Sequence, residues 1–257
     1  MMAVAWALIS TEAIKLRRTI AVWLAVGAPA LAVLIELIAV FGRTAPPRGD
    51  AGAQWRLLLQ PGWTAWFGFC LPMFIAFEAA YLAHLEHSGK QWKQLFAFPI
   101  PRWGVYAVKM LFCALLAGVS FLIAVTGFVI DVLSYGVVYG LHLASVLPWP
   151  EILATAGKAY AASWLLIVIQ SWLGARFTGI ISPVGIGFAA LVMGFVLLPI
   201  GEGALSSWYP WLLPLRTFLA APGDLHQTTL PAVFGCTGAV VSGAIACWDL
   251  ARRRDFA

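Results

Sequence analysis

Charged side chains are scarce in this sequence. Asp, Glu, Lys and Arg together make up 11% of the 257 residues, whereas soluble domains carry about 25%. Residues of the AVILMFWYC set reach 62%, which is more apolar surface than one soluble core of this size can bury. The composition excludes a soluble enzyme, a nucleic-acid-binding domain and a disordered chain. It predicts an integral membrane protein.

The motifs of metal, redox and nucleotide sites are also missing. The four cysteines lie in apolar segments without a CxxC spacing, which favours small buried side chains over disulfides or metal ligands. The stretch Ser88-Gly89-Lys90-Gln91 resembles part of a P-loop, but His84 stands where that motif needs Gly and Gln91 where it needs Ser or Thr. We therefore expect no cofactor, no metal and no catalytic residue on this chain.

A metal site near the membrane edge is one alternative that the residues suggest. His84 and His87 would share a face of a helix, with Glu86 beside them. The HExxH pattern and a third ligand nearby are absent, so an ordinary polar cluster at the interface is favoured. The GxSxG signature of hydrolases is absent as well, which disfavours hydrolysis within the membrane.

Six segments reach the length that spans a bilayer, about 20 residues each. They run approximately over 19–41, 63–83, 105–133, 154–173, 180–200 and 231–248. Lipid offers no hydrogen-bond partner to a bare backbone and strand-like alternation is missing, so these segments are predicted to be helices. The fold class is therefore all-α, with a single six-helix transmembrane domain over residues 1–257.

The basic residues predict the orientation of these spans. Eleven Lys and Arg residues flank one set of alternating helix ends, and five flank the other. Because Lys and Arg accumulate on the cytoplasmic side, both termini are predicted to be cytoplasmic. The predicted external connections are 42–62, 134–153 and 201–230, and the short turn 174–179 is internal.

A short amphipathic helix is predicted before the first span. Trp6, Ile9, Ala13 and Leu16 form a rough apolar stripe within residues 3–16. Such a helix would lie along the inner leaflet. The alternative is a frayed extension of the first span.

The loop between the second and third spans carries the most specific pattern. Ser88 and Gln91 form a capping-box pattern at the start of a helix, and Phe98 precedes Pro99, which favours a helix end there. A helix over 88–98 is too short to be stable alone in water, so it needs a surface to dock on. Its apolar face would be formed by Trp92, Leu95 and Phe96. That surface is either a layer of lipid headgroups or a cleft on a cytoplasmic partner.

This loop resembles the cytoplasmic loop of type-2 ATP-binding-cassette (ABC) exporter permeases, in particular the lantibiotic-immunity and bacteriocin-protection permeases. The matching residues are Glu86, Trp92-Lys93-Gln94-Leu95, Pro99, Arg102, Tyr106 and Lys109. The opening Glu12 and Lys15 to Thr19 is similar to the start of that family. The segment Trp208 to Trp211 with Pro214 resembles its motif between the fifth and sixth helices.

The resemblance implies a coupling helix at 88–98 that receives work from a separate ATPase. The residues it assigns to ATPase coupling are Glu86, Ser88, Lys90, Gln91, Trp92, Lys93, Leu95, Phe96, Pro99 and Arg102. It further implies two ABC ATPase subunits, which bind ATP and Mg²⁺, and a second permease subunit that is identical or a divergent sibling. It places the chain in the bacterial cytoplasmic (inner) membrane, in contact with membrane lipids and no nucleic acid.

Ionisable and small residues inside the spans are further candidates. Glu36, Glu78, Asp131 and Lys158 lie close enough to an interface for water or snorkelling to reach them, and Asp131 could pair with Lys158. These residues have either structural roles or roles in an exit path or a subunit contact. Glu36 and Glu78 are the candidates for a path or contact role. The fifth span offers Pro183 as a kink and Gly185 as a close-packing position, also for a pathway or a subunit interface.

These observations favour a permease that moves a hydrophobic or amphipathic compound outward with ATP hydrolysed by another subunit. The compound would be an antimicrobial peptide, a drug or a lipid-like molecule. The alternatives are a membrane-embedded enzyme acting on lipid or peptide, and a structural or sensory membrane subunit that drives no transport.

Overall fold

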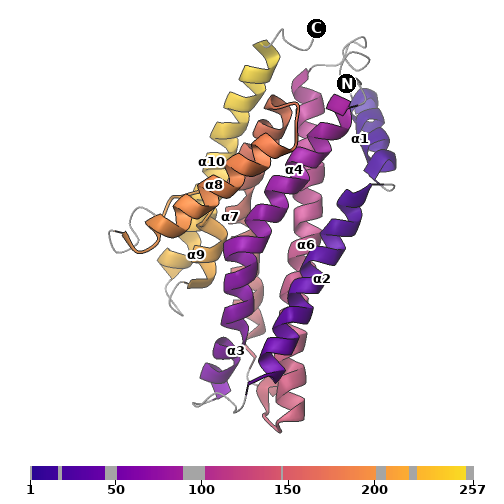
Figure 1. The fold of residues 1–257 in the computed structure, drawn as a ribbon. Coiled ribbons are helices and arrows are strands. Elements are labelled where there is room, and N and C mark those ends of the chain that lie inside the picture. The colour runs from indigo at the N-terminus through magenta and orange to yellow at the C-terminus, as the bar shows by residue number, and fades with distance from the viewer. Residues whose placement is uncertain are drawn as a thin grey trace.

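The computed structural model describes residues 2–16, 19–43, 51–88, 102–145, 147–200, 207–219 and 225–252. Every regular element in these ranges is helical, as predicted. The elements are α1 (Met2–Leu16), α2 (Ile20–Phe41), α3 (Ala51–Ala65), η1 (Trp66–Cys70), α4 (Leu71–Ser88), α6 (Arg102–Val138), η2 (Leu143–Ser145), α7 (Trp149–Arg176), α8 (Ile181–Leu197), α9 (Leu213–Leu219) and α10 (Leu225–Arg252). Figure 1 shows the long helices side by side in an elongated bundle.

Five helical stretches of the described chain are long and apolar enough to cross a membrane. They run over Ile20–Phe41, Gln54–Leu85, Trp103–Val138, Trp149–Arg176 and Gln227–Arg252. Helix α8 is apolar but has 17 residues, which at 1.5 Å per residue gives about 25 Å against a hydrocarbon core of about 30 Å. The protein is thus a multi-pass, all-helical membrane protein, and a sixth span at 180–200 stays a prediction.

The second span differs from its prediction. Residues 42–62 were predicted as an external connection, but residues from Ala51 onward form helix α3, which continues through η1 into α4. The prediction failed because polar residues lower the hydropathy of α3, although Trp55, Leu58 and Leu59 form a buried face at helical spacing. The chain is π-helical over Trp66–Cys70, where the amide of Leu71 bonds to the carbonyl of Trp66.

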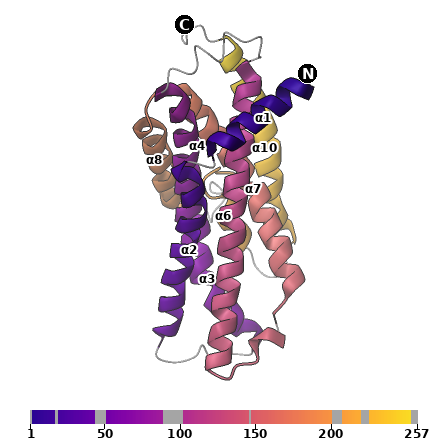
Figure 2. The same ribbon diagram turned by 90° about the vertical axis from the view of Figure 1, so that its right-hand side faces the viewer.

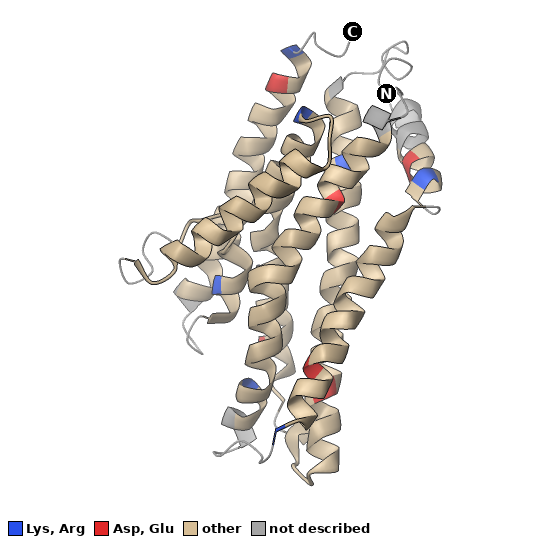
Figure 3. Ribbon diagram, viewed as in Figure 1, with Lys and Arg blue, Asp and Glu red and all other residues tan. Residues whose placement is uncertain are grey.

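Both termini lie at one end of the bundle. Figure 1 shows N and C at the top, near the end of α4 and the start of α6, and Figure 2 shows the same grouping after a 90° turn. The turn from α7 to α8 lies at that end too, and α3 lies at the opposite one. We call these the terminal end and the α3 end. Charged residues are found mainly towards the two ends (Figure 3). Which membrane face the terminal end occupies stays a prediction.

The N-terminal helix predicted for residues 3–16 is α1. It is separate from α2, because Thr19 at the start of α2 has an extended backbone (φ −106°, ψ 157°). Figure 2 shows α1 lying obliquely across the terminal end of α6 instead of continuing the axis of α2. The structure therefore rules out the alternative of a frayed extension of the first span.

The helices pack through small residues and an aromatic core. Helix α10 approaches α7 at Gly235, which lies against the backbone of Ala161 and Ala162. Near the α3 end, α9 is held by ring stacking, because the ring of Phe218 lies 4.1 Å from that of Phe67, centroid to centroid. The outer faces of α2, α8 and α10 expose large apolar side chains, as expected for surfaces in contact with lipid.

Candidate functional site

The helix ends that flank the predicted coupling segment lie at the terminal end. Ser88 is the last residue of α4 and Arg102 is the first of α6. Ser88 thus ends a helix, although the capping pattern predicted that it begins one. Glu86 lies in the last turn of α4. The other assigned residues lie outside the described residues; they are Lys90, Gln91, Trp92, Lys93, Leu95, Phe96 and Pro99.

A buried ion pair holds α1 against these helix ends. The Nζ atom of Lys109 on α6 lies 3.5 Å from Oε2 of Glu12 on α1, with 8% and 11% of their side-chain surfaces exposed. Lys109 also donates to the carbonyl of Leu82 on α4, at 3.1 Å. Lys15 reaches the other oxygen of Glu12, at 3.3 Å. One lysine therefore links α1, α4 and α6 close to the ends that carry the coupling segment.

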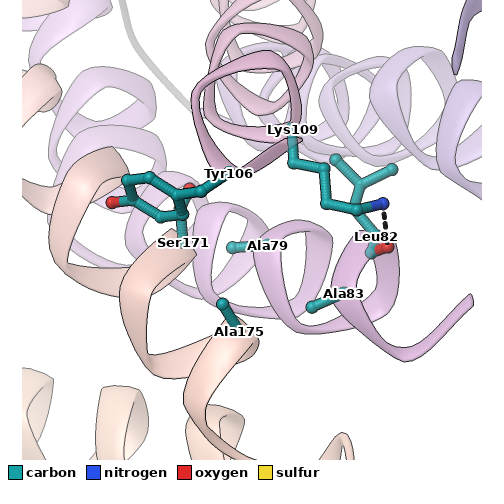
Figure 4. Close-up of a pocket in the computed structure, with 7 residues that line it drawn as sticks. All are labelled: Ala79, Leu82, Ala83, Tyr106, Lys109, Ser171 and Ala175. Atoms are coloured by element: carbon teal, nitrogen blue, oxygen red, sulfur yellow. Dashed lines mark hydrogen bonds between the residues drawn. The ribbon is translucent and has the colours of Figure 1, made fainter. Parts of the chain in front are cut away.

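A small cavity lies beside this lysine (Figure 4). Its volume is about 10 Å³, close to the room that one water molecule needs. Tyr106 lines it and donates its hydroxyl to the carbonyl of Val168 on α7, at 3.1 Å. Ser171 lines it too, and its buried Oγ lies beside the thiol of Cys113 on α6. The remaining lining residues are Ala79, Leu82, Ala83 and Ala175. The lining is mainly apolar, and the cavity is too small for a cargo molecule.

Glu78 is buried in the bundle and not close to water. Its exposed fraction is 0%, and neither carboxylate oxygen has a hydrogen-bond partner. It lies one helical turn before Leu82 on α4, and it interacts electrostatically with Cys113, which lies one turn after Lys109 on α6. The expectation that water or snorkelling relieves Glu78 is therefore wrong, because α4, α6 and α7 enclose the residue.

The predicted pairing of Asp131 with Lys158 is also wrong. Lys158 on α7 donates to the hydroxyl of Thr228 on α10, at 3.0 Å. Asp131 on α6 is 3% exposed and faces α2, where its electrostatic neighbour is Glu36. Distance along the sequence from a predicted membrane edge does not state the helix face on which a residue lies.

The candidates on α8 have different surroundings. Pro183 is buried in the first turn of α8, where its missing N–H removes no intrahelical hydrogen bond. It therefore begins the helix instead of kinking it. A Cβ atom added at Gly185 would meet nothing within 4 Å, so this glycine serves no close packing within the described chain. Their role in a pathway or subunit interface stays a proposal.

A second charged cluster ties α7 to α10 at the terminal end. Asp249 accepts a hydrogen bond from Nη1 of Arg176 and another from the indole of Trp172, each at 2.9 Å. Nδ1 of His84, a residue considered as a metal ligand, lies 3.3 Å from the carbonyl of Thr178. Within the described ranges, no group of three His, Cys, Asp or Glu side chains could hold a metal ion.

The segment before α9 connects α8 to the core near the α3 end. Tyr209 donates its hydroxyl to the carbonyl of Ala190 on α8, at 2.7 Å, and burial raises the pKa of this hydroxyl. Trp211 is buried, whereas Trp208 is largely exposed. The Trp208–Pro214 motif of the sequence therefore packs as part of the bundle and not as a free loop.

Sequence reasoning did not assign Glu12 or Lys109 to the site, although both stand in its matching segments. The two residues are far apart in the chain, so local patterns did not indicate that they form an ion pair. Charged residues are rare in so apolar a sequence and each buried charge needs a partner of opposite sign, and this could have indicated the pair.

Replacing Lys109 by Ala is expected to destabilise the full-length protein by about 3 kcal/mol, because Glu12 stays buried and, among the described residues, keeps Lys15 as a counter-ion. Lys15→Ala is the matched control, and its partly exposed pair predicts a loss below about 1 kcal/mol. Thermal unfolding of the purified variants measures both losses. Equal losses would contradict the role assigned to Lys109.

The comparison with family models gives one match. The model described as ABC-2 family transporter protein matches residues 8–196, which run from α1 to the last turn of α8. A comparison with curated proteins found no match. The matched region includes Glu12, Glu78 and Lys109 as well as the coupling segment.

Proposed function

The chain belongs to the ABC-2 family of transporter proteins, and from this we propose that it is the permease subunit of an ABC exporter. A separate cytoplasmic ATPase would supply the work. The observation that carries the proposal is the family match over 189 of 257 residues, which includes the α4–α6 connection. The end of α4 and the start of α6, which flank that connection, lie at the same end of the bundle as α1, and this supports the proposal.

The coupling helix at 88–98 is the proposed entry point of this work. ATP-driven closure of two ATPase subunits would push on Trp92, Leu95 and Phe96. Because this segment joins α4 to α6, such a push would move both helices. Lys109 binds the carbonyl of Leu82 on α4 and the carboxylate of Glu12 on α1, so α1 would follow the same movement.

The cargo is proposed to be hydrophobic or amphipathic, such as an antimicrobial peptide, a drug or a lipid-like compound, and it would move outward. The lantibiotic-immunity and bacteriocin-protection permeases remain the proposed branch, on the residues of the coupling loop. A second permease subunit, identical or a divergent sibling, would complete the path. Glu36, Glu78, Pro183 and Gly185 are the proposed path or interface residues, and the open space beside Gly185 supports a subunit contact there.

The proposed location is the bacterial cytoplasmic membrane, with both termini in the cytoplasm. The asymmetry of Lys and Arg supports this orientation. ATP and Mg²⁺ would bind to the partner subunit and not to this chain. The rival functions are a membrane enzyme acting on lipid or peptide and a membrane subunit that drives no transport.

The test is reconstitution of the purified permease with and without its co-expressed ATPase. The permease alone is expected to show no saturable ATP binding, because its Gly89-Lys90 pair lacks the rest of the phosphate cradle. The complex is expected to hydrolyse ATP and to export an amphipathic fluorescent peptide. ATP binding by the lone permease, or turnover of lipid or peptide without ATP, would support the enzyme instead. Hydrolysis without any export would support the non-transporting subunit.

A further inference from the structure

Two carboxylates meet in the seam where α2 packs on α6. Three contacts show that these helices run parallel and in step, since Ser120 donates to the carbonyl of Ala25 at 2.8 Å and Val33 lies against Gly127. The third contact joins the rings of Phe41 and Tyr135, 5.8 Å apart. Glu36 and Asp131 both fall between the second and third contacts. They therefore lie at matching levels of the same seam.

One oxygen of each group lacks a partner. Oε1 of Glu36 and Oδ2 of Asp131 are buried and make no hydrogen bond. The carboxylate of Glu36 also accepts a hydrogen bond from the backbone N–H of Gly62 on α3. Asp131 is 3% exposed, and its electrostatic neighbour is Glu36. The nearest described cation is Arg43, at the end of α2, which acts on Glu36. Two like charges this close in a low-dielectric seam would repel strongly.

The seam leaves little room for a bound molecule. A Cβ atom added at Gly62 on α3 would lie 3.1 Å from Cγ of Glu36 and 3.1 Å from Cδ1 of Phe128, so the backbone of α3 packs directly on Glu36. One turn towards the terminal end, the side chain of Val33 fills the space beside Gly127. An organic ammonium group or a hydrated metal ion would not fit here, whereas a proton needs no added space.

We propose that Glu36 and Asp131 form a proton-binding site, in which one carboxylic acid donates a hydrogen bond to the other carboxylate. The proton comes from water at the α3 end, and the pair then carries one negative charge in place of two. The shared hydrogen bond gives both buried oxygens a partner, and a hydrogen bond to a charged acceptor is short and strong. This proposal does not depend on the transport function.

The surroundings of the pair indicate that the bound proton stabilises the contact between α2 and α6. Helix α2 presents Arg43, α6 presents Tyr135 and Tyr139, and the facing residue of α3, Gly62, has no titratable group. Helix α2 meets the rest of the bundle mainly through α6, and its other faces expose apolar side chains. Loss of the proton would add a second negative charge to the seam that holds α2.

Infrared difference spectroscopy on the full-length permease in lipid nanodiscs tests the site directly. The variants are Glu36→Gln, Asp131→Asn and the double variant, with Glu78→Gln as a buried carboxyl control. Each single variant is expected to lose the same C=O band of a protonated carboxyl group, the double variant to lose no more, and the control to keep it. The proposal of a shared proton would be overturned if the band survived either single substitution. It would also be overturned if the double variant lost the sum of the band intensities that the two single variants lose.

Thermal unfolding over a pH series gives a second readout. The folded state binds a proton that two separated, solvated carboxylates of the unfolded chain release, so the stability falls as the pH rises. Tm of the wild type is expected to fall by about 3 °C between mildly acidic and mildly alkaline pH. Glu36→Gln and Asp131→Asn are each expected to reduce this slope by the same amount, whereas Glu78→Gln removes only the separate contribution of another buried carboxyl group. A slope that both single variants retain would overturn the proposal.

Discussion

Replacing Trp92 and Phe96 together by Ala is expected to leave the membrane helices inserted and to release the ATPase. Neither residue lies in a described span. On the proposed function, each aromatic ring is an anchor in a cleft of the ATPase, and burying such a side chain contributes about 1.5–3 kcal/mol. Loss of both anchors would weaken the complex by about 3–6 kcal/mol, which is about a 10²- to 10⁴-fold loss of affinity.

The measurement is recovery of the co-expressed ATPase on the purified permease, followed by cargo-stimulated hydrolysis. Lys93→Ala is the matched control in the same segment, and it is expected to change recovery little because a charge at a solvated rim contributes below about 1 kcal/mol. Full recovery and full stimulation in the double variant would leave the segment as a helix resting on lipid headgroups. That outcome would remove the coupling role from all the residues assigned to it.

Gly235→Ala is expected to cause a large loss of stability within the bundle. A Cβ atom at this position of α10 would lie 2.5 Å from Cα of Ala162 and 2.6 Å from the carbonyl oxygen of Ala161 on α7. Both are backbone atoms, so no side-chain rotation can make room, and the two helices must separate. Overpacking of this kind costs about 1–3 kcal/mol or more.

Two glycines on the same helix are matched controls. Gly243→Ala meets only a methyl group of Val168, at 3.8 Å, and is expected to be neutral. Gly238→Ala meets the flexible side chain of Leu165 at 2.9 Å, so an intermediate loss is expected. Thermal unfolding of the purified variants should rank Gly235 as the worst, then Gly238, then Gly243. An equal effect at all three positions would indicate that helix propensity, and not the backbone contact, sets the cost.

Part of the candidate site could be predicted from local patterns. The Trp92, Leu95 and Phe96 spacing and Pro99 predict the coupling segment from residues close together in the chain, but these residues lie outside the described ranges and the segment stays a prediction. The N-terminal helix was found from its stripe in the same way, and the structure confirms it as α1. By contrast, α3 was mistaken for a loop, because a hydropathy threshold hides a short amphipathic helix that continues into a span.

The pairing of charges could not be predicted in this way. Lys109 bonds across to Glu12 and Leu82, and Asp131 faces Glu36 instead of Lys158. Each of these partners is chosen by the rotation of one helix against another. Rotation depends on where small residues such as Gly127 and Gly235 allow close approach, and one sequence does not state which helices will meet.

The sequence by itself therefore determined that this protein resides in a membrane and that its long apolar segments are helices. Those properties follow from composition and from the spacing of apolar residues, and both can be read from neighbouring residues along the chain. The tertiary structure alone decided which buried charges are paired. Glu12 and Lys109 neutralise each other, whereas Glu36, Glu78 and Asp131 are left with buried oxygens that have no hydrogen-bond partner. The reason is physical: in a low-dielectric interior the energy of a charge depends on contacts a few ångströms away, between residues far apart in the sequence.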